Sequence, residues 1–201
     1  MSKVVILGAT GMIGSAIFNS LKSNQDLVLV MRDKSDWKLL EKAYGGAEGH
    51  QVLEFDADLF HADFINNNGS DSEYWSRFKS QIKDADYIIN AAGIVPSFAL
   101  NDESLTFFLN SALPHILARE FGDKFIHITT DCVFNGQVDY PYDENSTKTP
   151  VDIYGLSKSI GEPNGCLIIR TSTIGREIKN FKGLIEWFLR QEGKEIDGFA
   201  N

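Results

Sequence analysis

The first strand-forming run and the glycines that follow it constrain this chain most. Residues 4–7 are apolar and mostly β-branched, which predicts a buried parallel strand. Gly8, Gly11 and Gly14 follow at intervals of three, and a helical pattern begins near Gly11. Small residues at such a turn let the chain bend sharply, let backbone N–H groups approach a phosphate and let the helix pack on the strand. The stretch therefore predicts a nucleotide-phosphate turn, with an ordinary glycine-rich βα turn as the alternative.

Strand-like and helix-like segments alternate along the rest of the chain. Further apolar strand patterns occur at residues 27–31, 51–55, 86–90, 125–129 and 166–170. Helical patterns occur at residues 12–21, 36–43, 73–83, 102–121, from 152 onward and at 184–190. Pro114 predicts a kink or break in its helix, and residues 60–72 predict a loop. This alternation predicts an α/β fold with a doubly wound parallel sheet, whose ligands bind outside the carboxyl ends of the strands.

Charge and cysteine content exclude several classes of function. The 201 residues carry a net charge of -9, which argues against nucleic acid or an anionic membrane as the main partner, because both require a basic footprint. The N-terminus has no cationic, apolar leader and no run approaches a membrane span, so we expect a cytoplasmic protein. Cys132 and Cys166 lie among apolar residues and suggest buried thiols, less readily a disulfide, with no metal spacing.

Tyr154 and Lys158 are the residues that most directly suggest catalysis. Their i, i+4 spacing places them on one face of a helix. A nearby ammonium group stabilises a phenolate and lowers its pKa, so the pair could exchange a proton with a carbonyl or alcohol. Thr130 at a strand end could orient that carbonyl, and Asn110 could support Lys158 through a water or serve only as a polar residue in helix packing. A solvated Tyr–Lys pair would explain the spacing alone.

Four motifs together resemble a known family. They are GATGMIG at residues 8–14, NAAG at 90–93, TTDCVFNG at 129–136 and YGLSKSIGE at 154–162. These motifs resemble those of the extended short-chain dehydrogenase/reductases. The pattern T-D-x-V-F-x-G followed by Y-G-x-S-K-x-x-G-E resembles the dTDP-4-dehydrorhamnose reductase branch, whose members are sugar-nucleotide reductases. The resemblance covers about residues 3 to 190.

The resemblance implies an NAD(P)H-dependent reduction of a nucleotide-linked 4-keto sugar. Tyr154 matches the proton donor, Lys158 its partner and ribose ligand, and Thr130 the catalytic Ser/Thr, with Asn110 as a fourth candidate. Asp58 and Leu59 would lie at the adenine ring. The residues expected to bind the cofactor are Gly8, Thr10, Gly11, Met12, Ile13, Gly14, Arg32, Asp58, Leu59, Ala91, Ala92, Gly93, Tyr154 and Lys158.

Several alternatives stay open. Arg32 at the end of the second strand favours the 2′-phosphate of NADP, and Asp33 beside it leaves NAD open. Cys132 stands where the branch usually has an aromatic residue, and it cannot supply the glutamate that a dehydratase needs. A sugar-nucleotide epimerase and a non-catalytic dinucleotide-binding subunit share these motifs. We expect a Rossmann domain over residues 1–175 and the start of a truncated substrate lobe over 176–201, with a homodimer open.

Overall fold

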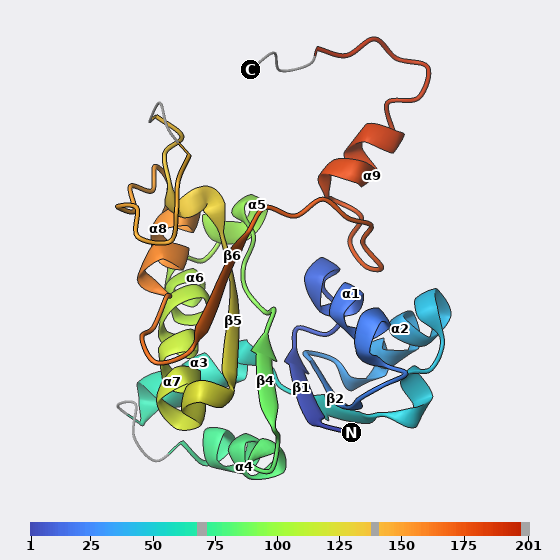
Figure 1. Cartoon of the computed structure of the whole chain (residues 1–201), viewed down its shortest axis with the longest axis vertical. Coiled ribbons are helices and arrows are strands. Elements are labelled where there is room, and N and C mark those ends of the chain that lie inside the picture. Colours follow the sequence, from blue (N-terminus) through green and yellow to red (C-terminus); the bar gives the residue numbers. More distant parts are fainter. Residues whose placement is uncertain (68–71, 138–140, 198–201) are drawn as a thin grey trace.

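A six-stranded parallel sheet forms the centre of the molecule (Figure 1). The structure is a computed structural model that describes residues 1–67, 72–137 and 141–197. The strands are β1 Lys3–Leu7, β2 Asp26–Met31, β3 Gln51–Glu54, β4 Tyr87–Asn90, β5 Phe125–Thr130 and β6 Leu167–Thr171. Their order, β3-β2-β1-β4-β5-β6, confirms the predicted fold. The order reverses between β1 and β4, which is where ligands of such sheets bind.

The helices connect and cover these strands. They are α1 Met12–Leu21, α2 Trp37–Tyr44, α3 Ala57–Asn66, α4 Glu73–Ile82, α5 Pro96–Ala99, α6 Glu103–Phe107, α7 Leu113–Phe121, α8 Ile153–Ile160 and α9 Leu184–Leu189. Short 3-10 turns, η1 Lys34–Asp36, η2 Ala47–Gly49, η4 Gly122–Lys124 and η5 Asp131–Val133, join several of them. α1, α4 and α9 lie close to their predicted positions, whereas α5 was not predicted.

The loop predicted at residues 60–72 is wrong for its first part, because α3 extends to Asn66. The Asp56 side chain caps this helix by accepting hydrogen bonds from the backbone N–H groups of its first turn. Phe60 is buried and stacks on Tyr74 and Trp75 of α4. An N-cap and aromatic packing therefore outweigh the local Asn-Gly signal. Residues 68–71 of the predicted loop lie outside the described residues.

The helix predicted at residues 102–121 is interrupted as expected near Pro114, although the interruption precedes the proline. A π-helical turn, η3 (Phe108–Ala112), separates α6 from α7. Pro114 has no N–H and cannot donate to the carbonyl of Asn110 four residues earlier. Gly161, the C-cap of α8, lies so close to that carbonyl that a Cβ atom at this position would clash with Asn110 O. Single π-turns of this kind occur often at functional sites.

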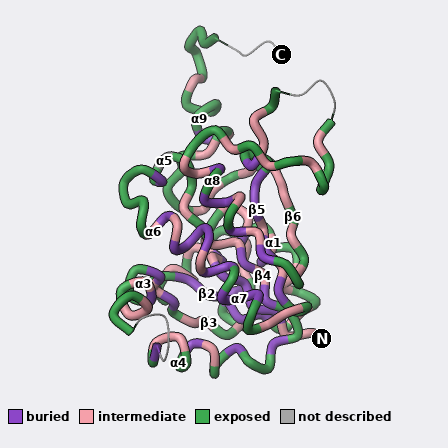
Figure 2. The backbone as a smooth tube through the Cα atoms, turned by 90° about the vertical axis from the view of Figure 1, so that its left-hand side faces the viewer, coloured by how far each residue is buried: buried purple, intermediate pink, exposed green. Residues whose placement is uncertain are grey.

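Two hydrophobic cores lie on opposite faces of the sheet. One joins β1, β2, β4 and β5 to α4 and α7, with Phe55, Phe60 and Phe125 among its large side chains. The other lies beneath α1 and α2 and includes Phe18 and Leu40. Figure 2 shows the resulting run of buried backbone through the middle of the molecule. At about 25 cal/mol per Å² of apolar surface removed from water, these cores supply the main stabilising contribution to the fold.

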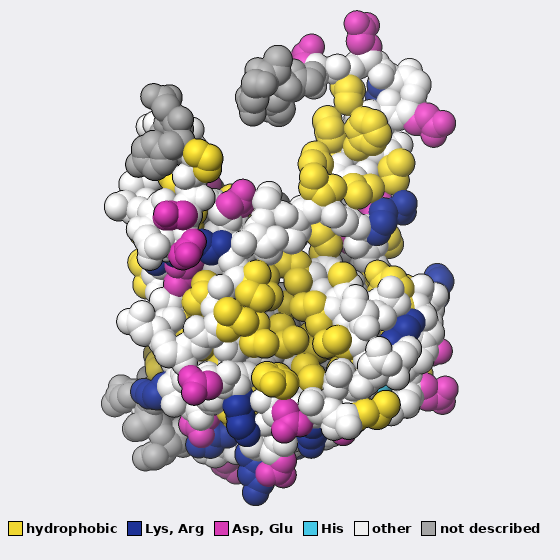
Figure 3. Space-filling model, in the orientation of Figure 1, with side chains coloured by type: hydrophobic (Ala, Val, Ile, Leu, Met, Phe, Trp, Pro, Cys, Tyr) yellow, Lys and Arg dark blue, Asp and Glu magenta, His cyan; other side chains and the backbone are white. Residues whose placement is uncertain are grey.

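One part of the sheet is covered on one face only. α7 and α8 pack on β5, and the side chains of Leu167 and Ile169 on β6 point to the opposite face, in register with Ile126 and Ile128. Leu167 is 54% exposed and Ile169 40% exposed. Figure 3 shows apolar side chains gathered over this region and over α9. A doubly wound sheet carries helices on both faces. Among the described residues, helices cover both faces at β1 and β2 but only one face at β6.

Gly14 is the residue whose replacement should disturb this packing most. A Cβ atom there would overlap the carbonyl oxygen of Gly8, and the obstacle is backbone that cannot rotate away. We expect Gly14→Ala to lower the free energy of unfolding by roughly 2–3 kcal/mol, measured by urea denaturation. Gly49→Ala is the matched control, because a Cβ at Gly49 would have nothing within 4 Å. Equal stability of the two variants would contradict this account of the α1–β1 contact.

Candidate active site

The turn after β1 has the geometry of a phosphate-binding turn. Gly8 has φ +77°, a conformation that favours glycine. A Cβ at Gly8 would lie 2.8 Å from the backbone nitrogen of Ala92, so the turn runs directly against the chain that leaves β4. Gly11 is the N-cap of α1 and has no side-chain cap, and the first turn of α1 contains no acidic residue. The N–H groups at the N-terminus of this ten-residue helix are therefore suited to bind an anionic group.

The other residues predicted at this turn lie around it. Thr10 and Ile13 are half-buried, and Met12 begins α1. The Met12 side chain lies beside Gly175, since its Cγ and Sδ would be 3.4 Å from a Cβ atom there. Met12 thus joins the turn to the segment after β6.

Arg32 and Asp58 form an ion pair at the carboxyl ends of β2 and β3. Arg32 Nη2 lies 3.3 Å from Asp58 Oδ2, and the side chains are 59% and 50% exposed. Asp33 is engaged locally: its carboxylate accepts hydrogen bonds from the Ser35 hydroxyl and N–H, which hold the pKa of Asp33 below its ordinary value. Leu59 is also exposed, on the first turn of α3. The structure therefore places Arg32 against Asp58, with Leu59 next to Asp58 on α3.

The chain leaving β4 is held by two asparagines. Asn90 Oδ1 accepts a hydrogen bond from Ala92 N at 3.1 Å. Asn110, on the π-turn η3, accepts from Ile94 N at 2.8 Å and donates to Ile94 O at 3.0 Å. Between these points, a Cβ at Gly93 would lie 2.6 Å from Lys158 Nζ and 2.9 Å from Asn110 Oδ1. Residues 91–93 therefore pass between the glycine turn and Lys158.

α8 brings Tyr154 and Lys158 to the end of β5. Asp152 caps the helix by accepting a hydrogen bond from Gly155 N at 2.6 Å. Gly155 allows the helix to approach the turn after β5, because a Cβ there would overlap the carbonyl oxygen of Cys132. The Tyr154 side chain consequently interacts with Thr130, the last residue of β5. The sequence motif named Tyr154 and Lys158 but assigned no role to Gly155, whose small size makes the approach possible.

The predicted effect of Lys158 on Tyr154 is wrong for this structure. Burial raises the pKa of the Tyr154 phenol above its ordinary value of 10.0, and a hydrogen bond with Thr130 opposes the rise only in part. The nearby Cys132 and Asp131 raise the pKa further. The phenol is therefore protonated at neutral pH, which is the form that a proton donor needs.

Lys158 is almost completely buried, with 6% of its surface exposed. Burial lowers the pKa of its ammonium group from 10.5 to about 8. A buried charge without a paired anion is unfavourable for folding. We therefore interpret Lys158 as a group kept for binding or catalysis, since an apolar residue at this position would favour folding.

Asn110 has more partners than the sequence predicted. In addition to Ile94, it donates a hydrogen bond to Ser157 Oγ at 3.1 Å, and Ser111 Oγ donates to Ser157 O at 2.6 Å. Both contacts tie η3 to α8 between Tyr154 and Lys158. Of the two predicted roles, packing between helices is the one these contacts match, while Oδ1 also lies near Lys158 Nζ.

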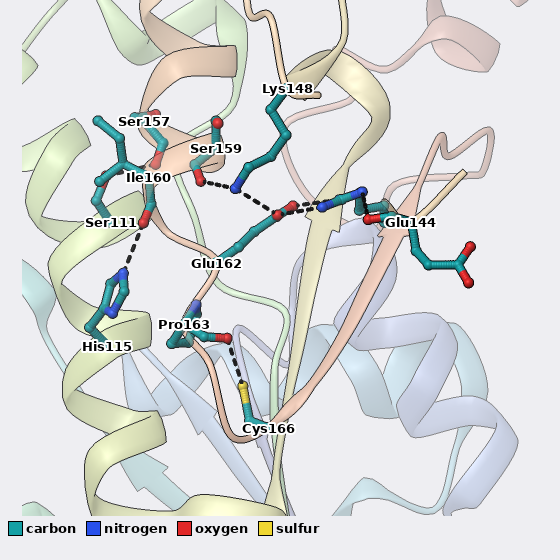
Figure 4. A network of polar contacts seen from close by, with 11 residues as sticks. Ser111, His115, Glu144, Lys148, Ser157, Ser159, Ile160, Glu162, Pro163 and Cys166 are labelled. Carbon is teal, nitrogen blue, oxygen red and sulfur yellow. Dashed lines mark hydrogen bonds and ion pairs between the residues drawn. The ribbon is translucent and has the colours of Figure 1, made fainter. Parts of the chain in front are cut away.

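A further network fixes the end of α8 to β6 (Figure 4). Glu162 accepts hydrogen bonds from Arg170 Nε and Nη2, both at 2.9 Å, and from Lys148 Nζ at 3.1 Å. Lys148 also donates to Ser159 O at 2.7 Å. The Glu162 side chain is only 5% exposed, so two cations compensate one buried carboxylate. The Y-G-x-S-K-x-x-G-E motif contains Glu162, but its partners are distant in sequence.

Arg170 belongs to the wall of a large cavity next to this network. The cavity has a volume of about 980 Å³ and extends from Asp131 and Cys132 to Glu162 and Arg170. Arg170 also lies over the ring of Phe134 at 5.3 Å. Cys132 is exposed and Cys166 half-buried, and both are free thiols. The expectation of buried thiols is therefore wrong for Cys132, and the alternative of a disulfide is excluded in this structure.

Two classes of site are absent from the described residues. None of their helices is long and apolar enough to cross a membrane. Residues 1–67, 72–137 and 141–197 also contain no group of three or more His, Cys, Asp or Glu side chains that could hold a metal ion.

The strand order and the glycine turn define a Rossmann-type α/β protein. A family model described as RmlD substrate binding domain matches residues 2–196, so the chain belongs to that family. The spore coat polysaccharide biosynthesis protein SpsK of Bacillus subtilis is 26% identical over 180 residues, which are 88% of this chain and 52% of SpsK. The chain spans about half the length of the curated relatives it matches.

Solved structures show the same fold. A hypothetical dTDP-4-dehydrorhamnose reductase from Sulfolobus tokodaii has a TM-score of 0.70 and 24% identity, covering 96% of this chain and 63% of that one. The dTDP-4-dehydrorhamnose reductase of Bacillus anthracis, solved in complex with NADP, has a TM-score of 0.59 and 22% identity. The match covers 94% of this chain and 59% of the Bacillus anthracis chain.

The buried charge of Lys158 should make the stability of the protein depend on pH. Its pKa is lower in the folded state, so the unfolded state binds more protons between pH 8 and 10.5, and stability attributable to Lys158 rises through that range. A shift from 10.5 to about 8 corresponds to about 3 kcal/mol. We expect Lys158→Met to be more stable than the parent by up to about this amount at pH 7, with the gain disappearing by about pH 11.

Urea denaturation at several pH values would measure this difference. Lys38→Met, at an exposed position on α2, is the control and should show no pH-dependent gain. A Lys158→Met protein that is less stable than the parent at pH 7 would show that Lys158 is held by favourable charge interactions instead.

Proposed function

We propose that this chain is the dinucleotide-binding part of an NAD(P)H-dependent reductase of a nucleotide-linked 4-keto sugar. The observation that carries the proposal is the convergence of three elements at one edge of the sheet. These elements are the glycine turn, the chain at residues 91–93, and α8 with Tyr154 and Lys158 beside Thr130. Membership of the RmlD substrate binding domain family and the names of its relatives support the reaction class.

The residues present fit a dinucleotide. Gly8, Thr10, Gly11, Met12, Ile13 and Gly14 would hold its pyrophosphate at the start of α1, with Ala91, Ala92 and Gly93 alongside. NAD(P)H supplies a hydride when it is bound. Residues 1–175 would form this binding domain, and residues 176–201 would begin the part that holds the sugar.

Within that site, Tyr154 would give its phenolic proton to the carbonyl oxygen of the substrate. The raised pKa keeps the phenol protonated until transfer. Thr130 would orient the same oxygen through its hydroxyl. Lys158, whose ammonium group lies beside Gly93, would bind a ribose hydroxyl. Because the pKa of Lys158 is about 8, we expect this charged hydrogen bond to weaken as the pH rises above 8.

Arg32 supports NADP as the preferred cofactor. A guanidinium group suits a phosphate because it offers a planar set of N–H donors. The Arg32 side chain is 59% exposed and, among the described residues, pairs with the exposed Asp58 alone, so it can turn toward a phosphate at little energetic cost. Asp33, the residue that left NAD open, uses its carboxylate to cap η1.

Replacing Tyr154 tests the chemistry. We expect Tyr154→Phe to reduce turnover of dTDP-4-dehydrorhamnose with NADPH by at least about 100-fold, because the proton donor is lost. Dinucleotide affinity should stay nearly unchanged. Loss of nicotinamide absorbance measures turnover, and fluorescence titration measures binding.

Tyr142→Phe is the matched control, because Tyr142 donates to Asn135 in a loop outside α8. It should keep parental turnover. Tight dinucleotide binding by the parent without turnover of any keto-sugar nucleotide would contradict the reductase proposal and favour a non-catalytic binding subunit. Interconversion of sugar epimers without net oxidation of NADPH would favour an epimerase.

Replacing Arg32 tests the cofactor preference. Arg32→Ala should weaken NADPH binding about 10- to 100-fold, the value of one charged hydrogen-bonding group, and leave NADH binding within a few-fold. Arg77→Ala, which removes an arginine on α4, is the control. Equal losses for the two dinucleotides would show that Arg32 does not recognise the phosphate.

A further inference from the structure

His127 is a fully buried histidine that the proposed chemistry does not use. It lies on β5 directly opposite Asn90 of β4 in the sheet register, and both side chains are 0% exposed. The two side chains meet, with Asn90 Nδ2 3.2 Å from His127 Nδ1. The other ring nitrogen, Nε2, has no hydrogen-bond partner among the described residues. An unpaired buried nitrogen is unfavourable, so the contact at Nδ1 is what distinguishes histidine here from an apolar residue.

The neighbours of Asn90 determine which way the proton on His127 lies. A backbone N–H can only donate, and Ala92 N–H points to the Asn90 carboxamide, so the group that faces Ala92 is Oδ1. The NH₂ group of Asn90 therefore faces His127 and donates to Nδ1. An imidazole that accepts at Nδ1 carries its proton on Nε2. The geometry thus selects one tautomer of neutral His127.

The charge state of His127 is consistent with this assignment. Burial lowers the pKa of the imidazole to about 3, electrostatic interactions with Lys158 and His115 lower it in the same direction, and a hydrogen bond with the Asn90 backbone opposes the fall only in part. His127 therefore stays neutral, and its Nδ1 remains an acceptor at any pH near neutrality. A protonated ring would instead place two donors face to face.

The bond from His127 reaches the dinucleotide site through two backbone contacts. The Asn90 carboxamide that it holds fixes Ala92 N, and Ala92 N lies 2.8 Å from the position that a Cβ on Gly8 would take. One residue further, a Cβ atom on Gly93 would lie 2.6 Å from Lys158 Nζ. A rotation of the Asn90 side chain would release Ala92 on the side that faces the glycine turn.

We propose that His127 is a positioning residue. By accepting a hydrogen bond from Asn90, it fixes the carboxamide that holds residues 91–93 between the glycine turn and Lys158. The consequence for ligand binding rests on the proposed dinucleotide site, whereas the hydrogen-bond arrangement is a property of the protein itself.

Nitrogen NMR of the whole chain with ¹⁵N-labelled histidine tests the arrangement without any mutation. The chain contains four histidines, and the spectrum of a His127→Asn variant identifies the signals of His127. We expect an unprotonated Nδ1 and a protonated Nε2 that do not titrate between pH 5 and 9. A protonated Nδ1, or a titration in this range, would overturn the proposal.

Two substitutions separate positioning from simple packing. His127→Leu keeps an apolar side chain of similar size but removes the acceptor, and His127→Asn restores an oxygen near the position of Nδ1. We expect hydrogen exchange of the Ala92 amide to become at least about tenfold faster in His127→Leu and to stay within about threefold of the parent in His127→Asn. Affinity for NADPH, measured by fluorescence titration, should follow the same order.

Thr129→Val is the control for loss of a buried polar group. Thr129 Oγ1 is the other buried side-chain nitrogen or oxygen atom in the described residues with no hydrogen-bond partner, and valine has nearly the same shape. In Thr129→Val, hydrogen exchange of the Ala92 amide and the affinity for NADPH should match those of the parent. Equal Ala92 exchange in His127→Leu and His127→Asn would overturn the positioning role. If the parent binds neither NADPH nor NADH, the proposed function fails, while Ala92 exchange and the tautomer still decide the role of His127.

Discussion

The close backbone contact between the glycine turn and the chain after β4 is the constraint on which the rest of the site depends. Gly8 has a positive φ and no room for a side chain against Ala92, and Gly14 brings α1 down onto the carbonyl of Gly8. Three backbone segments therefore meet where the order of the strands reverses. A larger residue at either glycine would separate them and move the N-terminus of α1 away from the crevice.

Glycines that allow close backbone approach also position the opposite wall of the site. Gly155 lets α8 approach the turn after β5, and Gly161 lets its end approach the Asn110 carbonyl, to which Pro114 cannot donate. Hydrogen bonds from Asn110 and Ser111 then fix the helix, and Glu162 ties its end to β6. Tyr154 and Lys158 are thus positioned by residues whose own side chains are small or are used in packing.

The strands of the sheet could be predicted from the sequence because each is a short apolar run between clear turn signals. The loop predicted at residues 60–72 failed where aromatic stacking on Phe60, a contact between α3 and α4, outweighed the local composition. The motifs identified Tyr154, Lys158 and the glycines, since their spacing is local. The contacts of His127 with Asn90 and of Glu162 with Lys148 and Arg170 join residues 8 to 37 positions apart, so no local pattern predicts them. The pKa of Tyr154 depends on burial, which spacing alone does not give.

Unfavourable features concentrate at the carboxyl edge of the sheet. Lys158 carries a buried charge, His127 and Thr129 have unpaired polar atoms, and Gly8 adopts a conformation rare for other residues. The two hydrophobic cores, built from ordinary apolar side chains, provide the stability that tolerates them. Departures from the rules of stable folding tend to occur where binding or chemistry requires them. Their position around residues 91–93 therefore supports this edge as the functional one, independently of the motifs that first suggested it.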